Sequence, residues 1–585
     1  MKPFLRELAL FAFFMVAAGF ALRPLPYRLG DSIPAGSDPP HHLYILNWLL
    51  DHGLSSDRFE GRMFHPAKNA VLRSDLSMGT VVLVAPLVPF VSEPLVRFNL
   101  ATWLSLAFSG WAFCLLARSW TASTLAGIFA GITAVLGSHQ SLHYVHLNLL
   151  TVGWLPIFLL ALDRVLDRGS AAFAGLAARG ESQPAFDERC IPSGLLRSEA
   201  RIRSIFGLFG SSPDGRIARL GAAADFHHGL LAAVSFALVA SSSGYYGVAA
   251  CVIAAVFFVR SPSAKAAKWG AVAAALAALL LSPYLMAYAR LHAEESLVRT
   301  SRELAKGSWT LADLGSRTLL HRTWNPAAGE PLFPGFVVMA LAALALWRGS
   351  KRERTLGLAA ALLFWLGLGE PGGLYRLLAL VPPFSSMRHP VTLTAVALML
   401  LSVVAAFGLA RVMRSKPALG AALLGLACLE MVAPANDFFE VAPGVPPVYQ
   451  ALLKLPPGPV LEVPPYEATP LIWAARRGFE TVNGGGAFIP ALTTRIETTT
   501  QNHWLTDSYQ PIDESKATGI LINETRLRYL ILPAGRRGGL DPLIQRFREC
   551  HCFREIGVYQ SDRLYEAVRD ASCPAWAGPR PVPSP

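Results

Sequence analysis

The chain has 585 residues, of which 53% are apolar and only 16% charged, and its formal net charge is +12. Soluble globular proteins carry about 25% charged residues, so the composition argues against an ordinary soluble protein. Long runs of Ala, Leu, Val and Phe recur up to residue 433, after which polar and apolar residues mix normally. We therefore expect a polytopic membrane domain over residues 1–433 and a soluble domain over residues 434–585. The positive charge then belongs to loops beside a membrane and gives no reason to expect nucleic acid.

Apolar segments of the first 433 residues are candidates for membrane crossings, each of which needs about 20 mostly apolar residues. They cover residues 5–22, 98–117, 122–138, 147–163, 228–242, 245–260, 268–288, 333–347, 355–369, 391–410 and 417–433. The stretch 79–96 is also apolar, but three prolines interrupt it, so we expect a surface-lying or re-entrant helix. The predicted fold class is a polytopic α-helical membrane protein with about eleven transmembrane helices.

With these spans, the basic residues of the short loops fall on one side of the membrane. They are Lys2, Arg6, Arg118, Arg164, Arg168, Arg260, Lys265, Lys268, Arg348, Lys351, Arg352, Arg354, Arg411, Arg414 and Lys416. Loops rich in Lys and Arg stay in the cytoplasm. We therefore expect the N-terminus and the loop 165–227 inside, and the loops 23–97 and 289–332 and the C-terminal domain outside. The first span is expected to remain attached, although its basic start also fits a cleaved signal peptide.

The first outer loop places ionisable residues directly after the first span, among them Asp31, Asp38, His41 and His42. An outward carboxylate beside a membrane can act as general base for an attacking hydroxyl or amine. It can also bind a divalent cation that neutralises a phosphate leaving group. Asp38 is the candidate for either role, with Asp31 as the second carboxylate. The structural alternative is that both are capping or turn residues before a surface helix over 41–52.

Two further outer segments carry basic residues on the side that is otherwise poor in them. Arg299 and Arg302 lie in the long outer loop, and Arg388 and His389 immediately precede a span. Arginine makes two-point contacts with phosphate, so an anionic lipid phosphate would explain these residues. Pairing with nearby glutamates on a surface helix explains Arg299 and Arg302 equally well.

The C-terminal domain has the pattern of a mixed α/β fold. Strands are predicted over 460–463 and 527–532, and short helices over 443–455 and 540–550. The turn Asn483–Gly486 contains three glycines, which would let its backbone approach a ligand closely.

Three cysteines lie in this C-terminal domain, where a disulfide is chemically permitted. They are Cys550, Cys552 and Cys573. We expect Cys573 to pair with one of the other two, which leaves one thiol over. Cys550-His551-Cys552 also hints at a metal, but no second ligand pair follows at zinc spacing.

The order of several short motifs resembles the GT-C superfamily of membrane glycosyltransferases, and more narrowly bacterial YfhO-like and related GT-C proteins. The motifs are Gly36-Ser-Asp38-Pro-Pro-His-His, Met63-Phe-His-Pro66, Ser243-Gly-Tyr245-Tyr246, Leu332-Phe-Pro-Gly335, Phe384-Ser-Ser-Met-Arg388-His-Pro390 and Val482-Asn-Gly484. They cover most of the membrane domain and reach into the C-terminal domain.

The resemblance implies an inverting transferase that takes a sugar from a polyprenyl-phosphate carrier to a glycan, lipid or protein acceptor outside the bacterial inner membrane. Asp38 would be its catalytic base, and Arg388 would face the lipid phosphate. Tyr245 and Tyr246 would line the sugar or lipid site, although interfacial aromatics need no such role. The first outer loop lacks the Asp-x-Asp or Glu-Asp pair of many relatives, so a divalent cation stays an open cofactor. Thr392 stands where relatives often carry a second arginine.

A non-catalytic scaffold of envelope assembly and a lipid-linked glycan transporter are the alternative functions. Transporters tend to place ionisable groups at the bilayer midplane and to show repeated halves. Here the spans contain few charges and the ionisable residues gather at the outer surface, which favours the transferase.

Overall fold

The structure, a computed structural model, describes most of the chain. The described residues are 2–53, 55–137, 140, 143–166, 213–295, 307–323, 330–378, 384, 387–442, 444–463, 469–496, 519–533, 551–570 and 572–573. The side chains of residues 2, 3, 213–224 and 311 are not described.

Each apolar segment predicted to cross the membrane falls on helix. The helices are α1 (Lys2–Ala21), α4 (Pro94–Thr121), α5 (Thr124–Leu136), α7 (Leu147–Leu150) with α8 (Trp154–Leu166), α11 (Pro213–Ser242), α12 (Gly244–Arg260), α13 (Ala264–Glu295), α15 (Phe336–Trp347), α16 (Lys351–Gly367), α18 (Val391–Ser415) and α19 (Pro417–Glu430). Within the described residues, 5 helical stretches are long and apolar enough to cross a membrane, and α5, α12, α15 and α19 are shorter apolar helices. These helices indicate a multi-pass membrane protein, while eleven crossings stay a prediction.

The proline-rich stretch 79–96 forms no single long helix. It consists of α3 (Met78–Val84), the short 3-10 helix η3 (Ala85–Leu87) and the beginning of α4 at Pro94. A helix of 7 residues spans only about 10 Å, a third of the bilayer core. The expected interruption of this stretch is therefore present, while its surface-lying or re-entrant placement stays a prediction.

Helix ends that carry the basic residues of the short loops are joined by ion pairs. Arg118 contacts Glu7 at 2.7 Å, Arg352 contacts Asp163 at 2.9 Å, and Arg411 contacts Glu353 at 2.5 Å. These contacts join the C-terminal ends of α4, α8 and α18 to the N-terminal ends of α1 and α16. The structure thus ties together three of the basic helix ends that the sequence assigns to the cytoplasm, and the orientation in the membrane stays a prediction.

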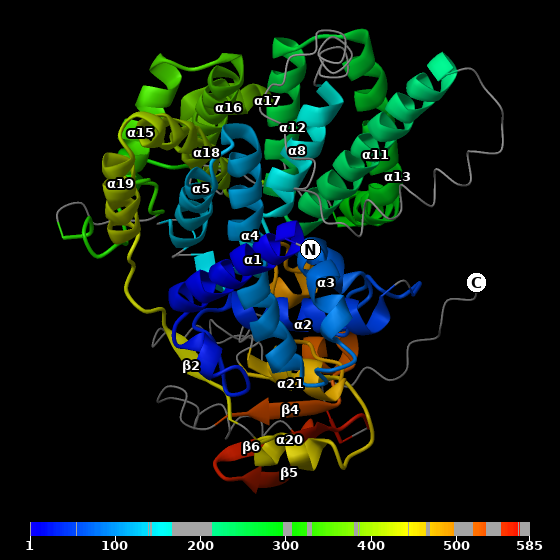
Figure 1. Cartoon of the computed structure of the whole chain (residues 1–585). Helices are drawn as coiled ribbons and strands as arrows, with labels where there is room; N and C mark the ends of the chain where they lie inside the picture. The colour runs from blue at the N-terminus through cyan, green and yellow to red at the C-terminus, as the bar shows by residue number, and fades with distance from the viewer. Residues whose placement is uncertain are drawn as a thin grey trace.

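The first outer loop folds into short elements that contact the C-terminal part of the chain. Its elements are η1 (Leu25–Tyr27), β1 (Ser32–Pro34), α2 (Asp38–His52) and η2 (Ala70–Arg73). Strand β1 pairs antiparallel with β2 (Phe438–Glu440), and α2 packs against α21 (Thr469–Arg477). In Figure 1, α2 and α3 lie between the long helices and the C-terminal strands.

The C-terminal part contains a four-stranded sheet in the order β3-β4-β6-β5. Its strands are β3 (Val460–Glu462), β4 (Tyr529–Leu532), β5 (Phe553–Tyr559) and β6 (Asp562–Ala567). Strands β3 and β4 are parallel, and the other two pairings are antiparallel. The predicted strands coincide with β3 and β4, and α20 (Pro447–Leu452) lies within the predicted helix 443–455. The predicted helix 540–550 lies outside the described residues.

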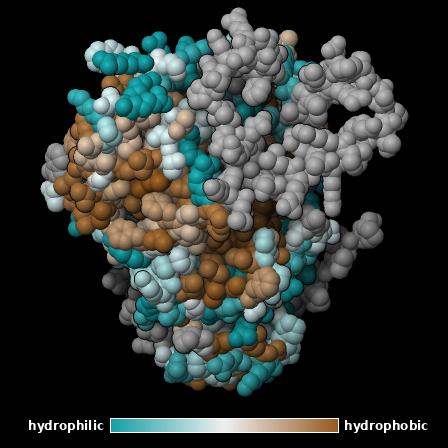
Figure 2. Space-filling model, in the orientation of Figure 1, coloured by the Kyte–Doolittle hydropathy of each residue, from teal (hydrophilic) through white to brown (hydrophobic). Residues whose placement is uncertain are grey.

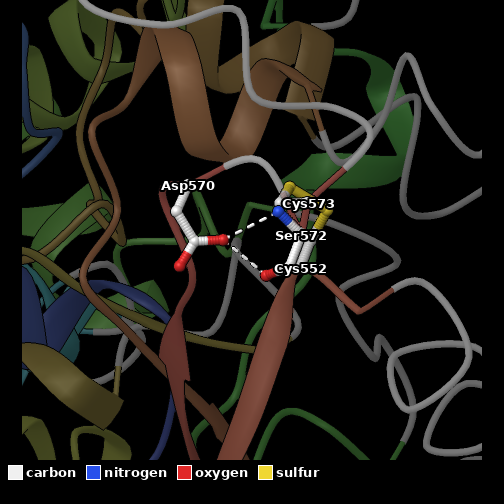
Figure 3. The surroundings of a disulfide bond; sticks show 4 residues. All are labelled: Cys552, Asp570, Ser572 and Cys573. Atoms are coloured by element: carbon white, nitrogen blue, oxygen red, sulfur yellow. Dashed lines mark hydrogen bonds between the residues drawn. A yellow bond between two sulfur atoms is a disulfide. The ribbon is translucent and has the colours of Figure 1, made fainter.

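A disulfide joins Cys552, just before β5, to Cys573, just after β6, as Figure 3 shows. The two Cα atoms are 4.5 Å apart. Asp570 accepts hydrogen bonds from the backbone N–H and the hydroxyl of Ser572 and so shapes the turn beside Cys573. The prediction that Cys573 pairs with one of two cysteines is confirmed, and Cys550 lies outside the described residues.

The molecular surface repeats the division seen in the sequence. Figure 2 shows a broad apolar band on the helical part, with polar residues at the top and over the part that holds the sheet. Exposed leucines at Leu279, Leu280, Leu358, Leu419 and Leu429 contribute to the apolar surface of the helices. Such a band is what a bilayer would cover.

Candidate functional site

Asp38 opens helix α2, and the local sequence explains why a helix begins there. Ser37 is the N-cap residue, and the two prolines that follow Asp38 occupy the first turn, where a missing N–H is tolerated. Gly36 precedes them with a φ of 153°, a conformation that favours glycine. The carboxylate therefore sits at the positive end of a 15-residue helix, where negative charge is favoured.

A line of hydrogen bonds runs from Asp38 through two histidines to a second carboxylate. Asp38 Oδ2 lies 2.8 Å from His146 Nε2, His146 Nδ1 lies 3.0 Å from His143 Nδ1, and His143 Nε2 lies 2.8 Å from Glu330 Oε2. We call these four residues the carboxylate–histidine chain. They come from the start of α2, from the turn around η4 (His143–Val145), and from the loop before α15. Sequence analysis singled out Asp38, but gave no role to Glu330.

The surroundings of Asp38 in the carboxylate–histidine chain favour its ionised form. Burial raises the pKa of Asp38, but the hydrogen bond from His146 outweighs it and holds the pKa below its usual value. Burial lowers the pKa of His143, although Glu330 partly opposes this shift. Burial also lowers the pKa of His41, to about 4, so His41 is neutral at ordinary pH. Asp38 is thus a carboxylate with neutral histidines beside it on α2.

The two histidines of α2 that follow Asp38, His41 and His42, are buried. The rings of His41 and His42 are 4.2 Å apart, and His41 Nε2 lies 3.3 Å from the hydroxyl of Ser74. The glycine-rich turn of the C-terminal part packs directly against His41, since a Cβ atom on Gly485 would lie 2.8 Å from the Cβ of His41. The close approach expected of the turn Asn483–Gly486 is therefore made to side chains of the first outer loop.

A second, partly buried carboxylate, Asp75, contacts Asn148, two residues after His146. It accepts a hydrogen bond from Asn148 Nδ2 at 2.6 Å and one from the backbone N–H of Gly244, at the start of α12, at 3.3 Å. Burial raises the pKa of Asp75 above its ordinary value. Sequence analysis missed this residue, although its place directly before the apolar stretch 79–96 put it, like Asp38, at a membrane surface.

Arg388 and His389, which were predicted to contact the lipid phosphate, lie just before α18 (Val391–Ser415). The backbone N–H groups of Arg388 and His389 donate to the hydroxyl of Tyr245 at 3.2 and 3.0 Å. Both side chains are exposed just before α18 begins at Val391. Burial and the charge of Arg388 lower the pKa of His389. Glu330, His146 and His143 of the carboxylate–histidine chain also contribute to this pKa, Glu330 in the opposite direction. Tyr245 thus ties the segment 388–389 to the start of α12.

Other predicted site residues lie elsewhere. Asp31 forms an ion pair with Arg28 at 3.1 Å, next to β1, and Tyr246 is buried with its hydroxyl donating to the Leu149 carbonyl at 2.7 Å. These contacts give both residues structural roles, and their roles in substrate binding stay predictions. Arg299 and Arg302 lie outside the described residues.

The described side chains do not fit a metal site. Among them, no group of three or more His, Cys, Asp or Glu residues is arranged to hold an ion. In the carboxylate–histidine chain, both ring nitrogens of His146 are already engaged by Asp38 and His143. A cation bound by His146 would have to replace one of these contacts.

Comparison with known proteins identifies the fold. No protein-family model matches the chain, and neither does any curated protein. Two cryo-EM structures of the arabinofuranosyltransferase AftD from mycobacteria superpose with TM-scores of 0.55 and 0.52 at 15% and 14% identity. They cover 95% and 97% of this chain, which spans 41% and 42% of the AftD chain.

Two other solved structures superpose less well. The oligosaccharyltransferase of Archaeoglobus fulgidus in complex with Zn and sulfate has a TM-score of 0.49 at 12% identity, covering 89% of this chain and 67% of that one. ArnT from Cupriavidus metallidurans bound to undecaprenyl phosphate has a TM-score of 0.40 at 12% identity, covering 98% and 99%. The mycobacterial structures, which superpose with TM-scores above 0.5, show that the chain shares their GT-C fold.

Proposed function

We propose that this protein is an inverting glycosyltransferase that moves a sugar from a polyprenyl-phosphate carrier to a cell-envelope acceptor outside the inner membrane. The observation that carries the proposal is the carboxylate of Asp38, which lies at a helix N-terminus and contacts His146 at 2.8 Å within a GT-C fold. An ionised carboxylate can accept the proton of an attacking hydroxyl or amine. The narrower likeness to YfhO-like proteins stays a prediction.

The segment before α18 supplies the features expected around a donor phosphate. The exposed side chains of Arg388 and His389 precede the N-terminus of a 25-residue helix. Phosphate binds favourably where a helix N-terminus and an arginine converge. Glu330, His143 and His146 act electrostatically on His389, which supports a phosphate site close to the proposed base. Arg299 and Arg302 remain proposed additional contacts to the lipid phosphate.

The proposed outer location rests on two independent features. Basic helix ends meet on one side of the bundle, as expected for the cytoplasmic side. The Cys552–Cys573 disulfide lies in the C-terminal part, and such bonds persist in oxidising compartments outside the cytoplasm. We therefore propose a membrane domain over residues 1–433, with about eleven crossings, and an exported α/β domain over residues 434–585.

Transfer by membranes that contain the wild type or Asp38→Asn tests this function. The donors are labelled polyprenyl-phosphate sugars, and the acceptor is a crude envelope fraction. We expect Asp38→Asn to lower the transfer rate at least about a hundredfold, because an amide cannot accept the proton. Asp57→Asn is the matched control, since Asp57 is an exposed carboxylate of the same loop.

Each outcome decides between functions. A large loss with Asp38→Asn and normal transfer with Asp57→Asn supports the transferase. Equal transfer by wild type and Asp38→Asn removes Asp38 from the base role. Absence of transfer by folded wild type with every donor favours the scaffold or the transporter.

A further inference from the structure

We infer that Glu330, acting through His143, holds His146 as a doubly protonated cation that positions the carboxylate of Asp38. The inference rests on the proposed function, in which Asp38 is the general base. His146 is a positioning residue here, because it acts on the reaction only through Asp38.

Hydrogen-bond donors and acceptors can be counted along the carboxylate–histidine chain. An ionised carboxylate only accepts, so the protons in the two carboxylate–imidazole contacts belong to His146 Nε2 and His143 Nε2. A neutral imidazole carries one ring proton, so His143 with its proton on Nε2 presents a bare Nδ1. The Nδ1–Nδ1 contact of 3.0 Å then needs a proton from His146. A second proton on His143 would satisfy the same contacts, but the His143 ring is buried whereas the His146 side chain is 31% exposed, and a charge is less costly on the more exposed ring. We therefore assign protons on both nitrogens to His146.

The electrostatic surroundings agree with this assignment of protons. Burial lowers the pKa of His143, which favours the neutral ring that the count requires. The lowered pKa of Asp38 favours the ionised acceptor. Other charged or titratable groups face the carboxylate–histidine chain: His41 and His42 on α2, Arg317 in the loop 307–323, and Arg388 and His389 before α18. The two arginines oppose a positive charge on His146, whereas the carboxylates of Asp38 and Glu330 favour it.

The position of His146 leaves one oxygen of Asp38 for the acceptor. Both nitrogens of His146 are engaged, so this ring cannot itself take the acceptor proton. Asp38 Oδ1 accepts a hydrogen bond from the Ser37 hydroxyl at 3.3 Å. The Asp38 side chain is 38% exposed. With Oδ2 held by His146, Oδ1 is the oxygen left to accept the proton of the acceptor.

The transfer step balances with the histidine protons unmoved. The acceptor O–H bond breaks, its oxygen bonds to the anomeric carbon, and the bond from that carbon to the lipid-phosphate oxygen breaks with its electron pair on the phosphate. The acceptor proton goes to Asp38 Oδ1 and then to water. A neighbouring cation favours the carboxylate over the neutral acid, so His146 helps to restore the base after each transfer.

The protonation state can be measured without any substrate. ¹⁵N NMR of the ¹⁵N-histidine-labelled protein in lipid, at about pH 7.5, separates a cationic ring with two protonated nitrogens from neutral rings with one. We expect a cationic ring in the wild type that disappears in His146→Asn and weakens in Glu330→Gln. His52→Asn, at a partly exposed histidine of the same loop, should retain it. A wild type without such a ring, or the same ring in His146→Asn, would overturn the inference.

Transfer kinetics test the consequence for Asp38. Glu330→Gln can donate as well as accept, so it no longer fixes the His143 proton on Nε2, and we expect kcat to fall about tenfold with little change in KM. His146→Gln, whose amide still donates to Asp38, should keep more activity than His146→Ala.

The two proposals fail separately. A cationic His146 in a folded protein that transfers no sugar overturns the proposed function. Active transfer with a neutral His146, or with kcat unchanged in both Glu330→Gln and His146→Ala, overturns the present inference alone.

Discussion

Carboxylates contact different cationic side chains in two regions of this molecule. Where the basic helix ends meet, Glu7, Asp163 and Glu353 each contact an arginine, and the last contact joins α16 to α18. In the carboxylate–histidine chain, Asp38 and Glu330 instead contact histidines. Arginine is always charged, whereas histidine gains and loses its proton near neutral pH.

The difference indicates separate tasks for the two regions. Permanent ion pairs between helix ends fix how the helices pack, and they respond little to protons. A chain of carboxylates and histidines can hold a proton in a defined place, which suits a site that handles protons. Unfolding experiments on the arginine pairs and pH-dependent experiments near the carboxylate–histidine chain can contradict this division of tasks.

The largest expected effect on stability comes from the arginine region. Replacing Arg411 by Met leaves Glu353, whose side chain is 4% exposed, without its cation, and this should lower the free energy of unfolding by about 3–5 kcal/mol. Denaturant unfolding in lipid–detergent micelles measures the loss. Lys351→Met, at an exposed residue of the same helix end, is the control. Equal unfolding of Arg411→Met and the control would show that this pair does not hold α16 to α18.

A smaller and pH-dependent effect is expected at His41. Its pKa of about 4 in the folded protein lies below the ordinary value of 6.5, so between these values the unfolded chain binds a proton that the folded chain does not. Stability should therefore fall as the pH decreases through this window, by up to about 3 kcal/mol in all. His41→Gln keeps a polar contact for Ser74 but cannot titrate, so its stability should depend less on pH.

Unfolding of wild type and His41→Gln between about pH 7 and 4 measures this difference. His52→Gln, at a partly exposed histidine of the same helix, serves as the control. Parallel stability curves for wild type and His41→Gln would mean that His41 is not a buried neutral histidine.

The helices of the membrane domain could be predicted because each long apolar run leaves the chain little other choice in a bilayer. The position of Asp38 at the mouth of the first span was equally visible. Glu330 was not, because it reaches His143 across 187 positions of sequence. Local patterns do not encode such pairings, which depend on how α4, α5 and α18 pack.

The hairpin of β5 and β6 was missed for a more local reason. The strands are joined through Gln560 and Ser561, and Gln560 has a φ of 58°. Glycine, asparagine or aspartate usually occupies such a turn and signals a hairpin. The disulfide prediction succeeded in the same region, since few cysteines were available there.

The smallest expected effect tests how the C-terminal part influences the site. A methyl group on Gly485 would come within 2.8 Å of His41 Cβ, so Gly485→Ala must push the glycine-rich turn away from α2. We expect a stability loss of about 1 kcal/mol, as for other overpacked contacts. Transfer should fall more than this loss explains if the turn helps to hold α2 beside the carboxylate–histidine chain. Gly444→Ala is the control, because a Cβ there would meet nothing within 4 Å. Transfer that is equal in the two variants would limit the C-terminal part to a role away from Asp38, and would leave positioning of the base to His146 and Glu330.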